Sequence, residues 1–441
     1  MSDKPPAPAP LRVLGVFDAS MLVVGSVIGA GIFLVGGFVA ESVSSPFGFL
    51  GVWLLGGLFA LSGALCNGEL GAMFPRGGGE YVYLREAFGG LFGFLSGWTS
   101  FWIGFPGSIA TLAAGFGRGS AELLGLSSSM ENPIGLVAVV ALTSLNVFGL
   151  RPGKWVQNVL SVSKLVAFAA VLLVGLAVGS SHGEHFHPFL GSESPRGLAV
   201  ALIPIYFAYS GWNAATYVAG EMKNPGRDLG RALAFGTAIC TALYLLVNAA
   251  FVNALGLPAI RGAHDVAGAA ARQIFGPGAG VVVTGLIVVA VLSSLQASIL
   301  VGPRIYHAMA EDGLFPARIA RLSPGSRVPV DALIAQGLLS CALLVSGTFE
   351  ALLNFTTFAL CLFSIICVVA VPVLRVRRPD AERVFKTPGY PLTPALFVLG
   401  NGWVLVSLLS SGARSAFIGL GIVLTGVPAY FVFRRKKVTA G

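Results

Sequence analysis

Long apolar runs separated by short polar segments are the dominant pattern along the 441-residue chain. A helix needs about 20 apolar residues to cross the hydrocarbon core of a bilayer, which is about 30 Å thick. The runs therefore predict about twelve membrane-spanning helices. They begin near Val13, Gly48, Leu91, Asn132, Trp155, Gly197, Ala232, Gln273, Ala332, Ala351, Thr387 and Ser415. The first run has no small-residue cleavage site before the next polar loop, so we expect a retained helix and not a signal peptide.

Composition and charge agree with an all-α integral membrane protein. Only 11% of the residues are charged, whereas soluble domains carry roughly 25%. With about twelve spans, 22 of the 28 Lys and Arg residues fall on the side of the two termini and five on the other. The positive-inside rule then predicts that both termini are cytoplasmic. We expect a multi-pass protein of the cytoplasmic (inner) membrane. The net charge of +9 follows from this topology, and we expect the lipid bilayer, not nucleic acid, as its partner.

Two stretches weaken the helix where a span should be continuous. Gly25, Gly29 and Gly31 interrupt the first span, and the sequence 207–213 places a Ser-Gly pair among aromatic residues in the sixth. Unpaired backbone groups cost several kcal/mol in hydrocarbon, so a break survives only where it lines a cavity enclosed by protein. Close helix packing through the Gly25–Gly29 pair is the alternative for the first stretch alone.

Breaks five spans apart indicate two inverted repeats of five spans, because an odd number reverses the direction of the second copy. Broken helices at corresponding positions are the sequence signal for a transporter site at the middle of the membrane. Spans eleven and twelve then follow the ten-span core. The predicted regions are a cytoplasmic tail (1–12), a transport core (13–376, with repeats at about 13–181 and 196–376), a cytoplasmic loop (377–390), two helices (391–433) and a basic cytoplasmic tail (434–441).

Lys164 lies about nine residues into the fifth span. A lysine at this depth costs about 2.5–3.5 kcal/mol on insertion scales, which favours a functional role over a clamp between helices. We find no Asp or Glu at mid-membrane depth, since Asp18 and Glu69 lie near the inner ends of their spans. A cationic side chain of a ligand would therefore lack a counter-charge.

No pattern of catalytic or metal-ligating residues emerges. His182, His185 and His187 lie beside Glu184 in one polar loop, but no ligand cluster completes a metal site. The five cysteines fall in apolar runs without metal spacing and are expected to be packing residues. We expect neither a cofactor nor a metal, and not an enzyme, because Lys164 is the only charged group deep in a span.

Several stretches together resemble the amino acid–polyamine–organocation (APC) superfamily, and within it the prokaryotic relatives of the L-type amino acid transporters (LAT). The matching pieces are 29–33, 78–89, Lys164, 207–213, 221–225 and 304–316. The resemblance covers nearly the whole chain. It implies a five-plus-five inverted-repeat core (LeuT-like) with helices 1 and 6 broken, and transport of amino acids by alternating access.

The dipoles of the broken helices indicate which break binds which part of an amino acid, and these roles agree with the resemblance. The outer half of the first span begins near Gly31, where free N–H groups suit a substrate carboxylate. The outer half of the sixth span ends near Tyr209, where carbonyls suit an α-ammonium group. The predicted substrate-binding backbone comprises Val27, Ile28, Gly29, Ala30, Gly31, Phe207, Ala208, Tyr209, Ser210 and Gly211. The resemblance makes Phe207 a candidate outer gate, and Trp212 and Asn213 are expected to shape the side-chain pocket.

The resemblance also places Lys164 where sodium sits in sodium-coupled relatives, as a coupling or conformational switch. We therefore predict sodium-independent transport of neutral L-amino acids, by exchange or proton symport. The chain departs from related exchangers at Ala30, usually Ser, and Ser210, usually Gly, which affects the substrate range. Alternatives are a cationic amino acid or polyamine permease, or a sensor or scaffold that does not transport. The segment 118–131 has no Cys to tether an ancillary subunit, and nothing indicates an oligomeric state.

Overall fold

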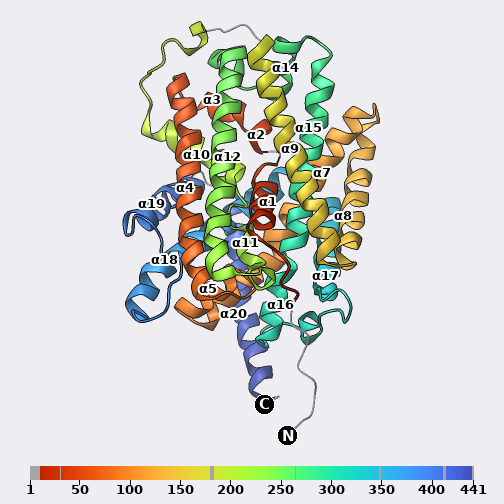
Figure 1. The fold of residues 1–441 in the computed structure, drawn as a ribbon, viewed down its shortest axis with the longest axis vertical. Coiled ribbons are helices and arrows are strands. Elements are labelled where there is room, and N and C mark those ends of the chain that lie inside the picture. Colours follow the sequence, from red (N-terminus) through yellow and green to blue (C-terminus); the bar gives the residue numbers. More distant parts are fainter. Residues whose placement is uncertain are drawn as a thin grey trace.

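The computed structural model describes residues 10–29, 31–178, 183–263, 265–346, 349–410 and 414–439. These residues form a bundle of helices, drawn in Figure 1, and their one sheet-like contact is the isolated bridge between Leu14 and Met222. The longer uninterrupted helices are α4 (Pro46–Met73), α6 (Gly90–Thr99), α7 (Phe105–Leu123), α8 (Glu131–Val147), α9 (Leu150–Val178), α12 (Pro225–Leu255), α15 (Ala279–Val301), α17 (Val330–Ser346), α18 (Phe349–Arg377), α19 (Leu392–Ser410) and α20 (Arg414–Thr439).

Both predicted breaks are present. The first span divides into α1 (Val16–Val27), α2 (Gly31–Leu34) and α3 (Gly36–Glu41), with the chain leaving the helix after Val27. The N–H of Val35 donates to the carbonyl of Gly31 at 3.1 Å, so α2 and α3 continue one another. The sixth span divides into α10 (Pro195–Tyr209) and α11 (Ala214–Tyr217), joined by four residues in turns.

Short helices lie at opposite ends of the bundle. Figure 1 shows α3 and α14 (Val266–Phe275) at one end, and α5 (Glu80–Phe88) with α16 (Pro303–Glu311) at the other. We refer to these as the α14 end and the α16 end. Six of the nine residues of α5 are buried, so this short helix packs inside the protein. The C-terminal part of α20 also projects at the α16 end (Figure 1).

Helix α15 begins later than the eighth apolar run of the sequence suggests. The run starts near Gln273, but α14 ends at Phe275 and α15 begins at Ala279. Gly276 adopts a φ of 88°, in the left-handed region that favours glycine, and so turns the chain between the two helices. The segment 256–276 contains the two short helices α13 (Leu257–Ile260) and α14.

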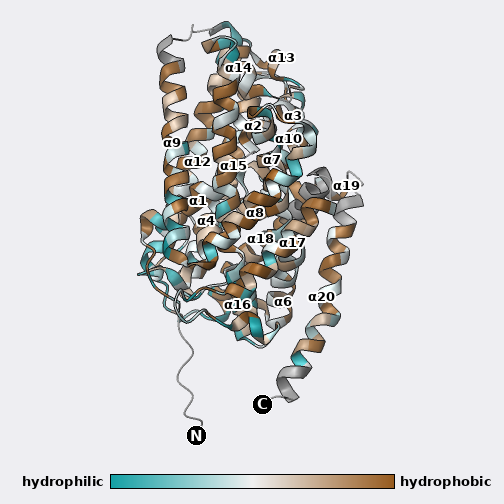
Figure 2. Ribbon diagram, turned by 90° about the vertical axis from the view of Figure 1, so that its right-hand side faces the viewer, coloured by the Kyte–Doolittle hydropathy of each residue, from teal (hydrophilic) through white to brown (hydrophobic). Residues whose placement is uncertain are grey.

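Length and hydropathy within the described part of the chain agree with a membrane protein. Six helical segments are long and apolar enough to cross a bilayer, and five shorter apolar helices accompany them. Figure 2 shows hydrophobic residues along the helices of the bundle, while hydrophilic residues gather toward its two ends. Helices of this kind satisfy their backbone hydrogen bonds internally, as a hydrocarbon environment requires.

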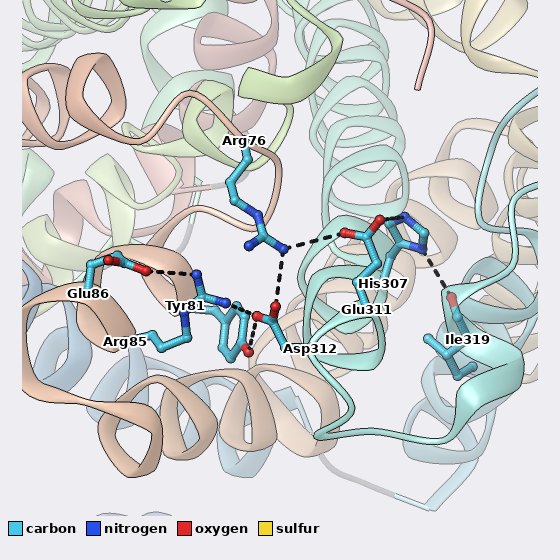
Figure 3. Close-up of polar contacts among 8 residues, drawn as sticks. All are labelled: Arg76, Tyr81, Arg85, Glu86, His307, Glu311, Asp312 and Ile319. Carbon is cyan, nitrogen blue, oxygen red and sulfur yellow. Dashed lines mark hydrogen bonds and ion pairs between the residues drawn. The ribbon is translucent and has the colours of Figure 1, made fainter. Parts of the chain in front are cut away.

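Ion pairs and hydrogen bonds hold the α16 end together. In Figure 3, Asp312 accepts hydrogen bonds from Tyr81, at 2.6 Å, and from Arg85. Arg76 reaches both Glu311 and Asp312 at 3.5 Å. These contacts tie α5 and the segment before it to the end of α16. Deeper in the bundle, Arg304 of α16 and Glu221 form an ion pair at 3.0 Å with both side chains almost fully buried.

Candidate functional site

The two helix breaks lie against each other at the centre of the bundle. A Cβ atom on Gly31 would lie 2.6 Å from the Cα atom of Ala208, closer than real Cβ atoms approach. Gly211 adopts a φ of 99°, and a Cβ atom there would lie 2.7 Å from the Cβ atom of Ser26. Each break therefore carries a glycine where the other break comes closest. Larger side chains at these positions would push the two segments apart.

A small cavity of about 100 Å³ opens between the breaks and the helices α7, α15 and α18. Eight of the residues predicted from the sequence line it. They are Val27, Gly29, Gly31, Phe207, Ala208, Ser210, Gly211 and Asn213. The remaining lining includes Ser108, Thr111, Tyr217 and Ser294, so hydroxyl groups are frequent among the side chains that face the cavity.

Two of these hydroxyl groups indicate a polar ligand. Ser26 and Thr111 line the cavity, and their side-chain oxygens are buried and have no hydrogen-bond partner among the described residues. Buried polar groups are nearly always hydrogen-bonded, because leaving one unpaired costs about 1–3 kcal/mol. A ligand with donors and acceptors would satisfy both oxygens.

Other residues predicted to belong to the site lie outside the cavity lining. Ile28 and Tyr209 do not line the cavity, and the hydroxyl of Tyr209 donates to the backbone carbonyl of Trp53 at 3.0 Å. Trp212, expected in the side-chain pocket, packs its ring against Phe397 of α19 with centroids 5.4 Å apart. Its ring therefore faces away from the cavity. Ala30 lies outside the described residues.

Lys164 is fully buried and contacts the first break directly. Its ammonium group donates to the carbonyls of Gly25 at 3.0 Å and Ile28 at 2.7 Å. Ser294 of α15 donates to the same Gly25 carbonyl at 2.7 Å. No carboxylate forms an ion pair with Lys164 among the described residues. The ammonium group and the serine hydroxyl therefore share the carbonyls that the break in the helix exposes.

Lys164 is the last of a series of contacts between one face of α9 and α1. Lys154 and Asn158 bind the carboxylate of Asp18 at 2.9 and 2.7 Å, and Ser161 donates to the carbonyl of Met21 at 2.9 Å. The spacing of these residues on α9 matches the helical repeat, so their side chains share one face. The series holds α1 along its length up to the break.

Tyr244 of α12 joins the two breaks and was not identified from the sequence. Its hydroxyl lies 2.8 Å from the carbonyl of Val27 and 3.0 Å from that of Ala208. The residue is fully buried. A buried tyrosine hydroxyl needs a partner, which is the signal that could have marked this tyrosine in an otherwise apolar run.

Glu80 is a buried carboxylate close to the site that was not among the predicted site residues. It is 3% exposed at the first position of α5. Its Oε1 atom accepts hydrogen bonds from Asn213, at 2.9 Å, and from Ser364 of α18, at 3.2 Å. The sequence places Glu80 in an inner segment, but the fold brings it directly behind a residue that lines the cavity.

Groups outside the spans have structural contacts. Glu193 accepts hydrogen bonds from Ser44 and Ser45 at 2.9 and 2.6 Å, joining the segments before α4 and α10. Burial opposes its ionisation, but these hydrogen bonds outweigh burial and hold the pKa of Glu193 below its usual value. In the histidine loop, His185 contacts the carbonyl of Asn253 at 2.7 Å, whereas His182 lies outside the described residues.

Comparisons with known proteins cover almost the whole chain. The family model for amino acid permeases matches residues 14–430. The serine/threonine exchanger SteT of Bacillus subtilis (strain 168) is 32% identical over 431 residues, which cover 97% of this chain and 98% of that protein. The human large neutral amino acids transporter small subunit 2 is 30% identical, covering 96% and 80%. The mouse b(0,+)-type amino acid transporter 1 is 28% identical, covering 96% and 88%.

Proposed function

The chain belongs to the amino acid permease family, and from this premise we propose that it moves neutral L-amino acids across the cytoplasmic membrane by alternating access. It is a multi-pass membrane protein and an amino acid transporter, not an enzyme. The observation that carries the proposed site is the small cavity between two apposed helix breaks. The relatives include proteins named for exchange of serine and threonine and for large neutral amino acids.

We propose about twelve spans, with both termini cytoplasmic and two inverted repeats at about 13–181 and 196–376. The α16 end would then face the cytoplasm. The positions of two short helices support the repeats. Helix α5 follows the second proposed span and α14 follows the seventh, yet they lie at opposite ends of the bundle (Figure 1). An inverted repeat places equivalent elements in this way.

In the proposed mode of binding, the two breaks recognise the part that all amino acids share. The first amides of the segment that begins at Gly31 face a carboxylate, because the first N–H groups of a helix have no partner within it. The carbonyls at the end of α10 accept hydrogen bonds from the α-ammonium group. Ala208 and Phe207 line the cavity there. A carbonyl oxygen has two lone pairs, so the contact with Tyr244 leaves the Ala208 carbonyl able to accept another.

The contacts of Lys164 support transport without sodium. A sodium ion would need the exposed carbonyls of the first break as ligands, and the ammonium group already binds those of Gly25 and Ile28. We propose that Lys164 acts as the conformational switch of the cycle. Its ammonium group links the first break to α9 by hydrogen bonds, and Ser294 links the same carbonyls to α15.

A neutral substrate fits the charges around the cavity. None of the described residues that line it carries a charged side chain, so a lysine or arginine side chain would be buried there without an ion-pair partner. Glu80 lies behind Asn213 and accepts its hydrogen bond, which separates the carboxylate from the cavity. We also propose that the carrier works without a disulfide-linked subunit, because the segment 118–131 contains no cysteine.

We expect the purified protein to bind small neutral L-amino acids but not derivatives that lack either shared group. Methyl esters remove the carboxylate charge, and N-acetyl derivatives remove the ammonium group. Each loss leaves a charge-assisted hydrogen bond unmade, worth about 1.5–3 kcal/mol, and so lowers affinity by roughly 10- to 100-fold. Isothermal titration calorimetry in detergent with L-threonine, its methyl ester and its N-acetyl derivative measures this directly.

L-Arginine and spermidine serve as controls for the alternative substrate classes. Binding of either one more tightly than any neutral amino acid would contradict the proposed substrate class. Equal affinity for L-threonine and its methyl ester would contradict the proposed role of the first break.

A further inference from the structure

A buried acidic side chain without an ion-pair partner among the described residues lies next to the cavity. Three glutamates of the described chain are buried, namely Glu69, Glu80 and Glu221. Glu69 pairs with Arg375 and Glu221 pairs with Arg304, at 2.6 and 3.0 Å. Glu80 pairs with no Lys, Arg or His of the described residues. A buried carboxylate without an ion pair is costly, and an apolar side chain of the same size would fill the space as well.

Two glycines bring this carboxylate to the second break. Gly78 and Gly79 adopt φ values of 111° and 51°, and a Cβ atom on Gly79 would lie 2.4 Å from the ring of Tyr217. The N–H of Gly78 donates to the carbonyl of Tyr217 at 3.1 Å. The start of α5 therefore packs closely against α11. Glu80, the first residue of α5, reaches Asn213 from this position.

The contacts of Asn213 define which of its polar atoms can meet a ligand. Its Nδ2 atom donates to Oε1 of Glu80 at 2.9 Å and to the hydroxyl of Tyr217 at 3.0 Å. An amide nitrogen has two hydrogens, so both are used. The other polar atom of the side chain, Oδ1, only accepts hydrogen bonds. Asn213 lines the cavity, and in this orientation it can offer a ligand an acceptor but no donor.

We propose that Glu80 is a positioning residue for substrate selection: it fixes the Asn213 amide so that the transporter favours neutral amino acids whose side chain carries a hydroxyl donor. This inference rests on the proposed function and deepens it, because it names a class among the neutral amino acids. Ser364 donates to the same Glu80 oxygen at 3.2 Å and keeps that oxygen an acceptor. The small cavity, about 100 Å³, limits the class to short side chains such as those of serine and threonine.

The test compares L-threonine with L-valine, which has nearly the same shape but carries a methyl group in place of the hydroxyl. A neutral hydrogen bond contributes about 0.5–1.5 kcal/mol, so the wild-type protein should bind L-threonine roughly three- to tenfold more tightly. In Glu80→Met the Asn213 amide loses the acceptor that fixes it. The dissociation constant for L-valine should then exceed that for L-threonine by less than about twofold. The dissociation constant for L-valine itself should change by less than about twofold relative to the wild-type protein.

Three further variants separate positioning from general damage. Glu80→Gln retains an oxygen acceptor at the same place and should keep most of the threonine preference. Tyr217→Phe removes the other acceptor of the Asn213 amide but keeps the ring, and should lower the preference for L-threonine over L-valine. Glu122→Met removes an exposed carboxylate from α7 and should leave both affinities unchanged. Size-exclusion profiles and melting temperatures report folding of each variant.

Calorimetric titration of the purified full-length protein gives the answer. A wild-type threonine preference that Glu80→Met abolishes and Glu80→Gln retains supports the inference. The same preference in Glu80→Met as in wild type overturns it, and so does equal wild-type affinity for the two ligands; in both cases binding of neutral amino acids still stands. If the wild-type protein binds no neutral amino acid, the proposed function itself is overturned. Should Glu80→Met fail to fold, an unchanged preference in Tyr217→Phe overturns the inference.

Discussion

Replacing Lys164 by Ala is expected to slow amino acid transport by roughly 100-fold or more, while leaving a folded protein in the membrane. The ammonium group makes two charge-assisted hydrogen bonds, to the carbonyls of Gly25 and Ile28. Each is worth about 1.5–3 kcal/mol. Without them the first break loses its contact with α9, and the carbonyls keep only Ser294 and the surrounding backbone as partners. The initial rate of amino acid uptake into proteoliposomes measures the effect.

Ser161→Ala is the matched control for this variant. Ser161 lies on the same face of α9 and donates to the carbonyl of Met21, which belongs to the intact part of α1. Loss of one neutral hydrogen bond there should change transport by less than about tenfold. Wild-type rates in Lys164→Ala, at equal amounts of reconstituted protein, would show that Lys164 is not the switch.

Substitution of Gly31 by Ala, and more strongly by Val, is expected to abolish detectable substrate binding. The new Cβ atom would lie 2.6 Å from the backbone of Ala208, and backbone cannot move aside as a flexible side chain can. The two breaks must then separate, which displaces the groups proposed to bind the carboxylate and the ammonium group. Loss of the charge-assisted hydrogen bonds to these two groups, each worth about 1.5–3 kcal/mol, should lower the affinity by about 100-fold or more. Titration calorimetry with L-threonine tests the loss.

Gly36→Ala provides the control in the same span. A Cβ atom on Gly36 would lie 3.6 Å from the side chain of Val266, an ordinary van der Waals distance. This variant should bind substrate with wild-type affinity. If Gly31→Ala binds as well as Gly36→Ala does, the close contact between the breaks is not needed for the site.

The sequence predicts the two breaks and Lys164 because each violates a simple rule. Gly29 and Gly31 weaken a helix where lipid requires one, and Lys164 carries a charge where lipid disfavours it. Such violations are visible without a structure, since they depend only on residue type and depth in an apolar run. The structure places both breaks side by side, and Lys164 on the first of them.

The direction of single side chains in the irregular segments is harder to predict. Helical periodicity orients side chains along a helix, but the four residues between α10 and α11 follow no period. Asn213 therefore faces the cavity while Trp212, its neighbour, packs on Phe397. Tyr244 belongs to an apolar helix, and only the fold shows which carbonyls its hydroxyl reaches.

Glu80 illustrates a different limit. Its depth depends on the backbone of Gly78 and Gly79, whose positive φ values fold α5 against α11. Counting residues from the end of the apolar run places it near the surface instead. A carboxylate directly after two glycines in a segment of mixed polarity gives no sign that it will be buried.

Counterflow in proteoliposomes tests the central claim most directly. Vesicles that contain the purified protein are loaded with unlabelled L-threonine or left empty, and uptake of labelled L-threonine is followed without sodium, with and without an inward proton gradient. The account predicts uptake that Lys164→Ala abolishes, either in loaded vesicles alone, as exchange, or in empty vesicles under the gradient, as proton symport. Absence of uptake of L-threonine and other neutral amino acids under all of these conditions, or uptake that requires sodium, would contradict it.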